Sequence, residues 1–251
     1  MMDIAIAPAS GIYLRESIAE LKKSLRLPQF ALPTIVTPAA FYGLFAVALA
    51  HGDTAGSTYS LATFGVFAAT GPALFGFGAG VAVERENGLI ELKRVSPLPA
   101  GAYVMAKLVS ASAMAALALM LIYTIGVIGG VRLSPGQWAA MAAVHLVSVI
   151  PFALLGFTLG MRLGAKGSIA AANALYLGLS IAGGLWMPIT ILPHWLQLFA
   201  WVTPPFHLAQ LALAVIGVPT QGGLALHIGG LALITLAALW FAIAGWRRSP
   251  A

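Results

Sequence analysis

The chain has 251 residues, of which 60% are hydrophobic and 8% are charged. A soluble domain usually carries about 25% charged residues, so the composition excludes a water-soluble globule, a disordered segment, a collagen-like rod and a nucleic-acid-binding module. The formal net charge is +6, and the absence of cysteine excludes disulfides and thiolate metal sites. Several apolar runs reach the roughly 20 residues that cross a bilayer, so we expect a polytopic membrane protein.

The first predicted element is an amphipathic helix over residues 14–27, which Pro28 ends. Its apolar side chains recur at helical spacing and form one stripe, made of Leu14, Ile18, Leu21 and Leu25. Charged residues occupy the other faces, so we expect the helix to lie in the headgroup plane with its basic face on anionic lipid. The alternative is a solvated helix with an incidental stripe. We divide the chain into a cytoplasmic tail with this helix, residues 1–28, and a single transmembrane domain, residues 29–251.

Six transmembrane spans are predicted after this helix. They cover residues 31–50, 59–83 (with a kink at Pro72), 102–131, 138–161, 169–187 and 224–246. The stretch 188–223 is broken by proline, and its helical segments, 193–201 and 206–218, are too short to cross. We interpret them as re-entrant or interfacial outer helices, with Trp186, Trp195 and Trp201 at headgroup depth. The predicted fold class is an all-α membrane protein with six transmembrane helices, an N-terminal amphipathic interfacial helix and short re-entrant outer helices between spans five and six.

The positions of the basic residues predict the orientation. With both termini cytoplasmic, twelve of the thirteen basic residues lie inside and only Arg132 lies outside. A seventh span would invert the last one and place Arg247 and Arg248 outside, so the pattern favours six. A bacterial inner membrane fits this asymmetry.

The spans offer little chemistry of their own. The sequence has no His-Glu-x-x-His and no phosphate-binding Gly-x-x-x-x-Gly-Lys-Ser/Thr motif, so we expect no enzymatic activity and no bound ATP. Intramembrane charges are nearly absent, which argues against an ion-coupled pump. We interpret the outer-side histidines as interfacial residues with no special role: His51, His145, His194, His207 and His227. The glycine pairs four residues apart predict close helix packing within the bundle, with a dimer contact as the alternative: Gly76/Gly80, Gly126/Gly130, Gly156/Gly160 and Gly160/Gly164.

The longest predicted cytoplasmic connection joins spans two and three. Gly88 can end span two, residues 89–95 can form a short charged helix, and Ser96-Pro97 forces an extended exit. Such a helix at the base of two spans suits contact with a cytoplasmic partner, whereas the alternative is a solvated loop.

This loop resembles that of ABC-2 type exporter permeases. The likeness is carried by Glu84-Arg85-Glu86-x-Gly88-x-x-Glu91, then Ser96-Pro97-Leu98 and Lys107. The outer stretch is similar to the same family at Gly184-x-x-Met187-Pro188, Leu192-Pro193-x-Trp195-Leu196 and Thr203-Pro204. The sequence departs from the family at Leu89, where Thr is frequent.

The resemblance implies a half-transporter: two copies of this chain, as a homodimer, with two copies of a separate ABC ATPase subunit that holds ATP and Mg. This chain would bind no cofactor, metal or nucleic acid. The ATPase-coupling residues would be Glu84, Arg85, Glu86, Gly88, Glu91, Lys93 and Arg94. The interfacial helix would lie beside them, and spans one, two and five would line the path. Residues 188–205 would gate its outer end, with Pro188, Pro193 and Trp195 as gate residues.

Aromatic side chains suggest the class of substrate. Those in spans one, two and five are Phe41, Tyr42, Phe45, Phe64, Phe67, Phe75 and Tyr176, and Asn173 is the lone amide of span five. Such a lining suits a hydrophobic or amphiphilic substrate, such as a drug, a lipid or a lipid-linked molecule, although lipid-facing aromatics fit equally well. The alternative functions are an ion-coupled secondary transporter, a non-transporting membrane anchor of an ATPase assembly and an intramembrane enzyme acting on lipids.

Overall fold

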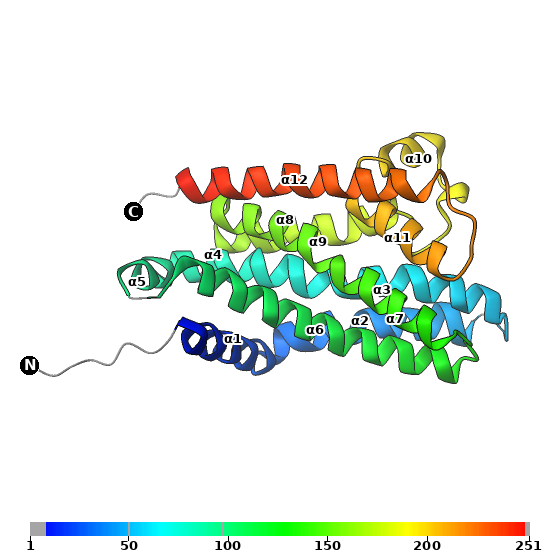
Figure 1. The fold of residues 1–251 in the computed structure, drawn as a ribbon, viewed down its shortest axis with the longest axis horizontal. Helices are drawn as coiled ribbons and strands as arrows, with labels where there is room; N and C mark the ends of the chain where they lie inside the picture. The colour runs from blue at the N-terminus through cyan, green and yellow to red at the C-terminus, as the bar shows by residue number, and fades with distance from the viewer. Residues whose placement is uncertain (1–8, 50, 97, 249–251) are drawn as a thin grey trace, which may run out of the picture.

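The computed structural model describes residues 9–49, 51–96 and 98–248, and within them it is helical without a strand. Figure 1 shows an elongated bundle whose long helices run side by side along one axis. One end holds α1, α5 and the end of α12, and is called the basal end here. The opposite end holds α10 and is called the distal end. The all-α membrane fold predicted from the sequence is confirmed.

The helices in chain order have the following bounds. They are α1 (Ala9–Leu25), α2 (Pro28–Phe41), the π-helix η1 (Tyr42–Ala48), α3 (Thr54–Phe77), α4 (Ala79–Glu86), α5 (Leu89–Val95), α6 (Ala100–Ile128), α7 (Pro135–Val147), α8 (Val149–Arg162), α9 (Ala165–Ala182), the 3-10 turn η2 (Ile189–Ile191), α10 (His194–Ala200), α11 (Pro204–Val215) and α12 (Leu224–Arg248).

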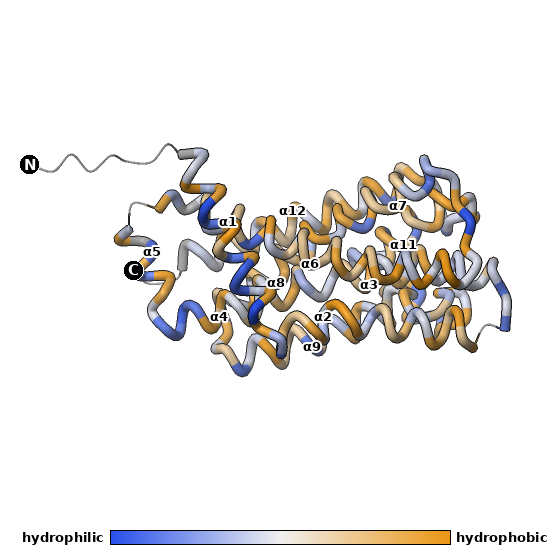
Figure 2. Tube along the Cα trace, turned by 90° about the horizontal axis from the view of Figure 1, so that it is seen from below, coloured by the Kyte–Doolittle hydropathy of each residue, from blue (hydrophilic) through white to orange (hydrophobic). Residues whose placement is uncertain are grey.

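Five continuous helical stretches in the described residues are long and apolar enough to cross a membrane. They are Pro28–Ala48, Thr54–Glu86, Gly101–Ile128, Pro135–Arg162 and Leu224–Trp246. They coincide with predicted spans one, two, three, four and six. Hydrophobic residues fill the length of these helices, and hydrophilic residues gather toward the ends of the bundle (Figure 2).

Predicted span five corresponds to α9, which ends at Ala182 rather than at residue 187. Gly183 and Gly184 end it, and Gly184 has a φ of 72°, a left-handed conformation that suits glycine. With 18 residues, α9 is about 27 Å long. It packs on α4 toward the basal end and on α10 and α11 at the distal end, so it traverses the bundle.

The segments predicted to be re-entrant form α10 and α11, which are bent by 85° relative to each other. The pair would count as one crossing only if read as a single broken span. Thr203 is extended and Pro204 begins the second helix, which forces the bend.

Span two is interrupted at Gly78, which separates α3 from α4, and α3 is continuous through Pro72. A kink at Pro72 stays a prediction. Gly78 lies against α8, where close approach requires glycine at two positions of α8. A Cβ on Gly156 would lie 2.6 Å from the Leu74 carbonyl oxygen, and one on Gly160 would lie 2.7 Å from that of Gly78. The Gly156/Gly160 pair therefore serves packing within the chain, as predicted.

Helix α3 is the centre of the bundle. Every residue from 61 to 74 is buried, because α2, α6, α8 and α11 surround the helix. A helix that is apolar on all sides and buried on all sides is what its sequence predicts.

Candidate functional site: a polar junction at the basal end

A buried cluster of charges joins α1, α4 and α6. Lys107 of α6 is only 3% exposed, and its Nζ lies 2.9 Å from Glu20 Oε1 and 3.1 Å from Glu84 Oε1. Lys23 of α1 completes the cluster at 2.6 Å from Glu20 Oε2 and 2.5 Å from Glu84 Oε1. The Tyr103 hydroxyl donates to Glu84 Oε2 at 2.7 Å. Two carboxylates and two ammonium groups thus balance one another, which is the condition for burying charge.

Lys23 stays protonated in this setting. Burial lowers the pKa of its ammonium, but Glu84 and Glu20 raise it, and the net effect is a pKa above its ordinary value. The α1 helix is therefore held to the bundle by ion pairs at neutral pH.

Lys93 holds helix α5 to helix α1. Its ammonium pairs with Glu16 of α1 and lies 4.8 Å from the centre of the Tyr103 ring. Because Tyr103 also binds Glu84, α5 and the buried cluster share a side chain.

Arg85 and Glu86 clamp the turn between α8 and α9. The Arg85 guanidinium donates to the carbonyl oxygens of Met161 and Leu163, the latter at 2.7 Å, at the carboxyl end of α8. Glu86 Oε1 accepts from the Ala165 N–H at 2.8 Å, at the amino end of α9. Each charge suits the helix end it meets, because unpaired carbonyls gather at carboxyl ends and unpaired N–H groups at amino ends.

The residues predicted to couple to an ATPase therefore fall into two groups. Glu84, Arg85, Glu86 and Lys93 are bound within the chain. Gly88 is exposed and follows the end of α4 in a left-handed conformation, with a φ of 70°. Glu91 is half-buried, and its carboxylate oxygen Oε2 has no hydrogen-bond partner. The side chain of Arg94 lies outside the described residues.

The free edge of α5 is apolar, which the sequence analysis missed. Leu89, Leu92 and Val95 are 43%, 63% and 83% exposed. Their spacing of three residues was the available signal, because positions three apart share one helix face. The sequence-based prediction assigned ATPase contact to the charged residues instead, although most of them face the bundle.

The α1 helix presents its predicted stripe outward. Leu14, Ile18 and Leu25 are exposed and Leu21 is half-buried, whereas Ser17 and Glu20 are buried toward the bundle. The helix crosses the long axis of the bundle in Figure 2. We expected the basic face of this helix on anionic lipid, but Lys23 pairs with Glu84 of the bundle instead. The carboxylates of the same helix, Glu16 and Glu20, pair with Lys93 and Lys107.

Most of the residues predicted to line a substrate path belong to one aromatic cluster. Phe67 and Tyr176 stack with ring centres 4.4 Å apart, and Phe75 lies 5.6 Å from Tyr176. Phe41 and Phe67 each contact Trp186, and Phe64 contacts Phe67. Tyr42 is fully buried and donates to the Ser57 carbonyl. Phe45 contacts Phe41, with ring centres 6.0 Å apart, but is exposed, and so is Asn173. Whether the cluster lines a path remains a prediction, as does the gate role of Pro188, Pro193 and Trp195, which are all exposed.

Three histidines expected to be interfacial are buried and hydrogen-bonded instead. His145 contacts the Tyr123 hydroxyl at 2.7 Å and the Ala62 carbonyl at 2.9 Å. His207 and His227 face each other with their Nδ1 atoms 3.1 Å apart.

The His207–His227 pair links α11 to α12. Each Nε2 contacts a backbone carbonyl at 2.9 Å, that of Trp201 for His207 and that of Gln221 for His227. A carbonyl only accepts, so both rings donate through Nε2. The contact between the two Nδ1 atoms is then a hydrogen bond only when one ring carries a second proton. His51 and His194 are exposed.

Comparison with known proteins defines the class. Residues 17–217 match the ABC-2 type transporter family. The chain therefore belongs to the ABC-2 type transporter family, and it is a membrane-embedded transport permease subunit. It is 28% identical over 232 residues to the "Putative transport permease YvfS" of Bacillus subtilis (strain 168), an alignment that covers 90% of this chain and 95% of the relative. In the described residues, no group of three or more His, Asp or Glu side chains is arranged to hold a metal ion.

Proposed function

We propose that this chain is the membrane subunit of an ATP-driven exporter that moves a hydrophobic or amphiphilic substrate out of the cytoplasm or the inner leaflet. A separate ABC ATPase subunit, in two copies, would hold ATP and Mg, and two copies of this chain would form the membrane part. The observation that carries the proposal is the short helix α5. One side of it exposes Leu89, Leu92 and Val95, and Lys93 holds it to α1 through an ion pair with Glu16.

The contacts of α5 suit the transmission of movement from a bound ATPase to the transmembrane helices. Leu89, Leu92 and Val95 offer a surface for an ATPase groove, since exposed apolar residues outside the spans need another partner. Behind them, Lys93 connects α5 to α1, and Arg85 and Glu86 connect α4 to the α8–α9 turn. Movement of α5 would therefore displace helices as rigid bodies rather than bend a loop.

The charge pattern supports the orientation. Basic residues of α1, α4, α5 and α8 gather at the basal end, and Arg132 lies in the connection between α6 and α7 at the opposite end. By the positive-inside rule this distribution supports a cytoplasmic basal end, and with it the proposed cytoplasmic termini and the proposed location in a bacterial inner membrane.

Substitution of the apolar edge tests the proposal. We expect Leu92→Asp or Val95→Asp to lower the amount of ATPase that co-purifies with the tagged chain in mild detergent by about tenfold, because burying one such side chain contributes about 1.5–3 kcal/mol. Asn87→Asp adds the same charge at a neighbouring exposed polar residue and is the matched control. Mass spectrometry of the eluate identifies and counts the partner.

Two outcomes would contradict the proposal. A wild-type chain that purifies without an ATPase from native membranes would favour a secondary transporter. An ATPase that is retained but hydrolyses ATP without any response to amphiphilic compounds, in vesicles that transport nothing, would favour a non-transporting anchor.

A further inference from the structure

Two histidine rings meet inside the bundle near its distal end, where α11 packs on α12 (Figure 1). His207 of α11 is 2% exposed and His227 of α12 is 0% exposed, and their ring centres lie 5.3 Å apart. The His207 ring also lies against Gly230 of α12, where an added Cβ would come within 2.5 Å of its Cε1 atom. Both imidazoles are therefore enclosed between the two helices.

Each ring binds a different connection of the distal end. His207 Nε2 donates to the carbonyl of Trp201, between α10 and α11, at 2.9 Å. His227 Nε2 donates to the carbonyl of Gln221, between α11 and α12, also at 2.9 Å. The Gln221 N–H donates in turn to Gln210 Oε1 at 2.9 Å. A bond between the two rings would therefore join both connections through one contact.

The two Nδ1 atoms that face each other leave room for one shared proton. They lie 3.1 Å apart, which is within the range of a hydrogen bond between nitrogen atoms. Because both Nε2 atoms carry hydrogens, each neutral ring presents a lone pair at Nδ1. Two facing lone pairs repel, whereas one added proton converts the contact into a charge-assisted hydrogen bond. The arrangement thus fits an imidazolium beside a neutral imidazole.

Aromatic side chains rather than charges surround the pair in the described residues. Trp201 stacks on His227 with ring centres 5.6 Å apart, and Phe206 contacts both histidine rings. Asp53, the one carboxylate among the described residues of the distal end, caps α3 by accepting from two N–H groups of that helix. The elements packed around the pair carry further titratable side chains, none of which bonds to either histidine in the part of the chain that the structure describes: Tyr59, His145, Arg162, Lys166, Tyr176 and His194. A proton on the pair is therefore held by the two imidazoles and not by a carboxylate.

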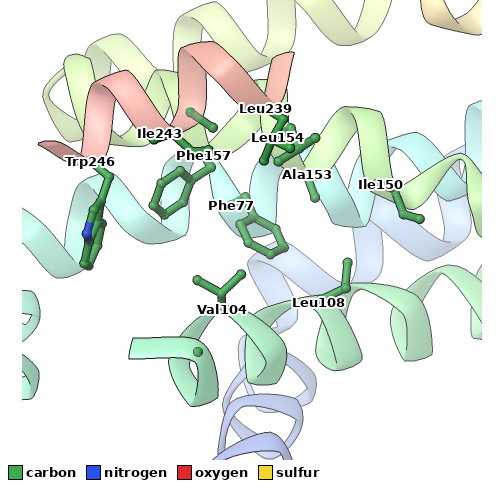
Figure 3. A pocket seen from close by; sticks show the side chains of 12 residues that line it. Phe77, Val104, Leu108, Ile150, Ala153, Leu154, Phe157, Leu239, Ile243 and Trp246 are labelled. Carbon is green, nitrogen blue, oxygen red and sulfur yellow. The ribbon is translucent and has the colours of Figure 1, made fainter. Parts of the chain in front are cut away.

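Helix α12 depends on this contact because few elements hold it. It packs mainly on α8 and α11, and only 22% of its membrane-crossing window is buried. Toward the basal end, Ile243 and Trp246 border an open apolar groove of about 370 Å³, with Val104 of α6 on the opposite wall (Figure 3). A bond between the histidine rings therefore joins α12 to one of its two main supports.

We propose that the His207–His227 pair is a pH-sensitive switch that binds one proton between its two Nδ1 atoms. On protonation, the new Nδ1–H group of one ring donates to the lone pair of the other ring, and this hydrogen bond joins α11, α12 and both distal connections in one network. On loss of the proton the two lone pairs repel, and the bond between the helices is lost.

Acidification therefore closes the distal end, and a rise in pH through the range in which imidazoles titrate, about pH 5–8, releases it. In the proposed exporter the switch would bind the gate segment 188–205 to α12 through Trp201. That the proton arrives from outside the cell rests on the proposed function, because it requires the distal end to be the outer one. The proton site itself does not rest on it.

Tryptophan fluorescence follows the proton directly. A protonated imidazole stacked on an indole quenches its emission by accepting an electron, whereas a neutral imidazole does not, and Trp201 stacks on His227. We expect the emission of a variant that keeps only Trp201 to fall on acidification in a single one-proton step. The emission of a variant that keeps only Trp240, an exposed residue of α12, should stay constant.

Two histidine substitutions show whether the proton is shared. His207→Phe removes the neutral acceptor, so we expect it to move the midpoint of the Trp201 step about one pH unit lower, because a hydrogen bond to a charged group contributes about 1.5–3 kcal/mol. His194→Phe removes an exposed histidine of the same end and is the matched control, which should leave the midpoint unchanged.

Hydrogen exchange tests the release in the chain with all its tryptophans. The Gln221 N–H, bound by Gln210, reports on the connection between α11 and α12. Below the midpoint we expect peptides that cover residues 216–223 to exchange about tenfold more slowly in the wild type than in His207→Phe. Above the midpoint the two proteins should exchange alike. Comparing them at the same pH cancels the chemical pH dependence of exchange.

Three results would overturn the proposal. A Trp201 titration unaffected by His207→Phe would mean that the rings share no proton. An exchange ratio that is the same at every pH would mean that the pair has only a structural role. One equivalent of zinc or copper per wild-type chain, absent from His207→Phe, would mean that a metal rather than a proton lies between the rings. None of these measurements requires an ATPase, so failure here is distinct from failure of the exporter assignment.

Discussion

At the scale of residues, Lys107 is the side chain on which the basal junction depends most. It is 3% exposed and contacts both Glu20 and Glu84, whereas Lys23, which binds the same carboxylates, has 44% of its side chain exposed. Loss of Lys107 would leave two buried carboxylates with one partly solvated cation, Lys23, which is far costlier than loss of a surface pair.

We therefore expect Lys107→Met to destabilise the chain by about 3–5 kcal/mol and to lower its Tm in detergent by several degrees. Lys23→Met should cost less, and Lys107→Met combined with Glu20→Gln should recover part of the loss. Thermal unfolding followed by intrinsic fluorescence measures all three. Equal Tm values for the wild type and Lys107→Met would contradict the account.

At the scale of elements, glycine determines how closely α8 can approach α3 and α4. A Cβ on Gly160 would lie 2.7 Å from the carbonyl oxygens of both Phe77 and Gly78. Both are backbone atoms, so relieving the clash would require a backbone shift that costs stability. On α9, by contrast, a Cβ on Gly178 would meet nothing within 4 Å.

These two glycines form a matched pair for substitution. Gly160→Ala should destabilise the bundle by about 1–3 kcal/mol, because overpacking forces backbone shifts. Gly178→Ala should leave stability unchanged or raise it slightly, because alanine favours helix over glycine. Chemical unfolding of both variants in the same detergent decides; a Gly160→Ala protein as stable as Gly178→Ala would show that the close approach is not required.

Elements were also the scale at which sequence reasoning worked best. Long apolar runs predicted five of the spans, and proline placed the short distal helices, because both signals are local. The end of α9 was misplaced, since apolar residues continue past Gly183 and Gly184 into the distal segment.

The partners of charged residues could not be read in this way. Glu84 binds Lys23 and Lys107, which lie 61 and 23 residues away, and Lys107 binds Glu20, 87 residues away. Nothing in the local pattern distinguishes these charges from solvated ones. The same limit hid the His207–His227 contact. The apolar edge of α5, by contrast, could have been predicted from the three-residue spacing of Leu89, Leu92 and Val95.

At the scale of the whole molecule, polar contacts at the two ends hold an apolar bundle between them. The basal junction ties α1, α4, α5 and α6 together. At the distal end the His207 ring of α11 packs against the His227 ring of α12, with ring centres 5.3 Å apart. Between them α3 is packed on all sides. Such packing would move the helices together, which is what the proposed coupling to an ATPase at the basal end requires.

The most direct test of the central claim, that a separate ATPase binds α5, is cross-linking in native membranes. The chain has no cysteine, so Val95→Cys can carry a single photoreactive label at an exposed position of α5. We predict that illumination joins it to a protein with a phosphate-binding Gly-x-x-x-x-Gly-Lys-Ser/Thr motif, whereas the same label on Ile128→Cys, at the distal end, is not joined to that protein. Adducts at Val95→Cys with lipid alone, or with no ATPase among the proteins captured, would contradict the account.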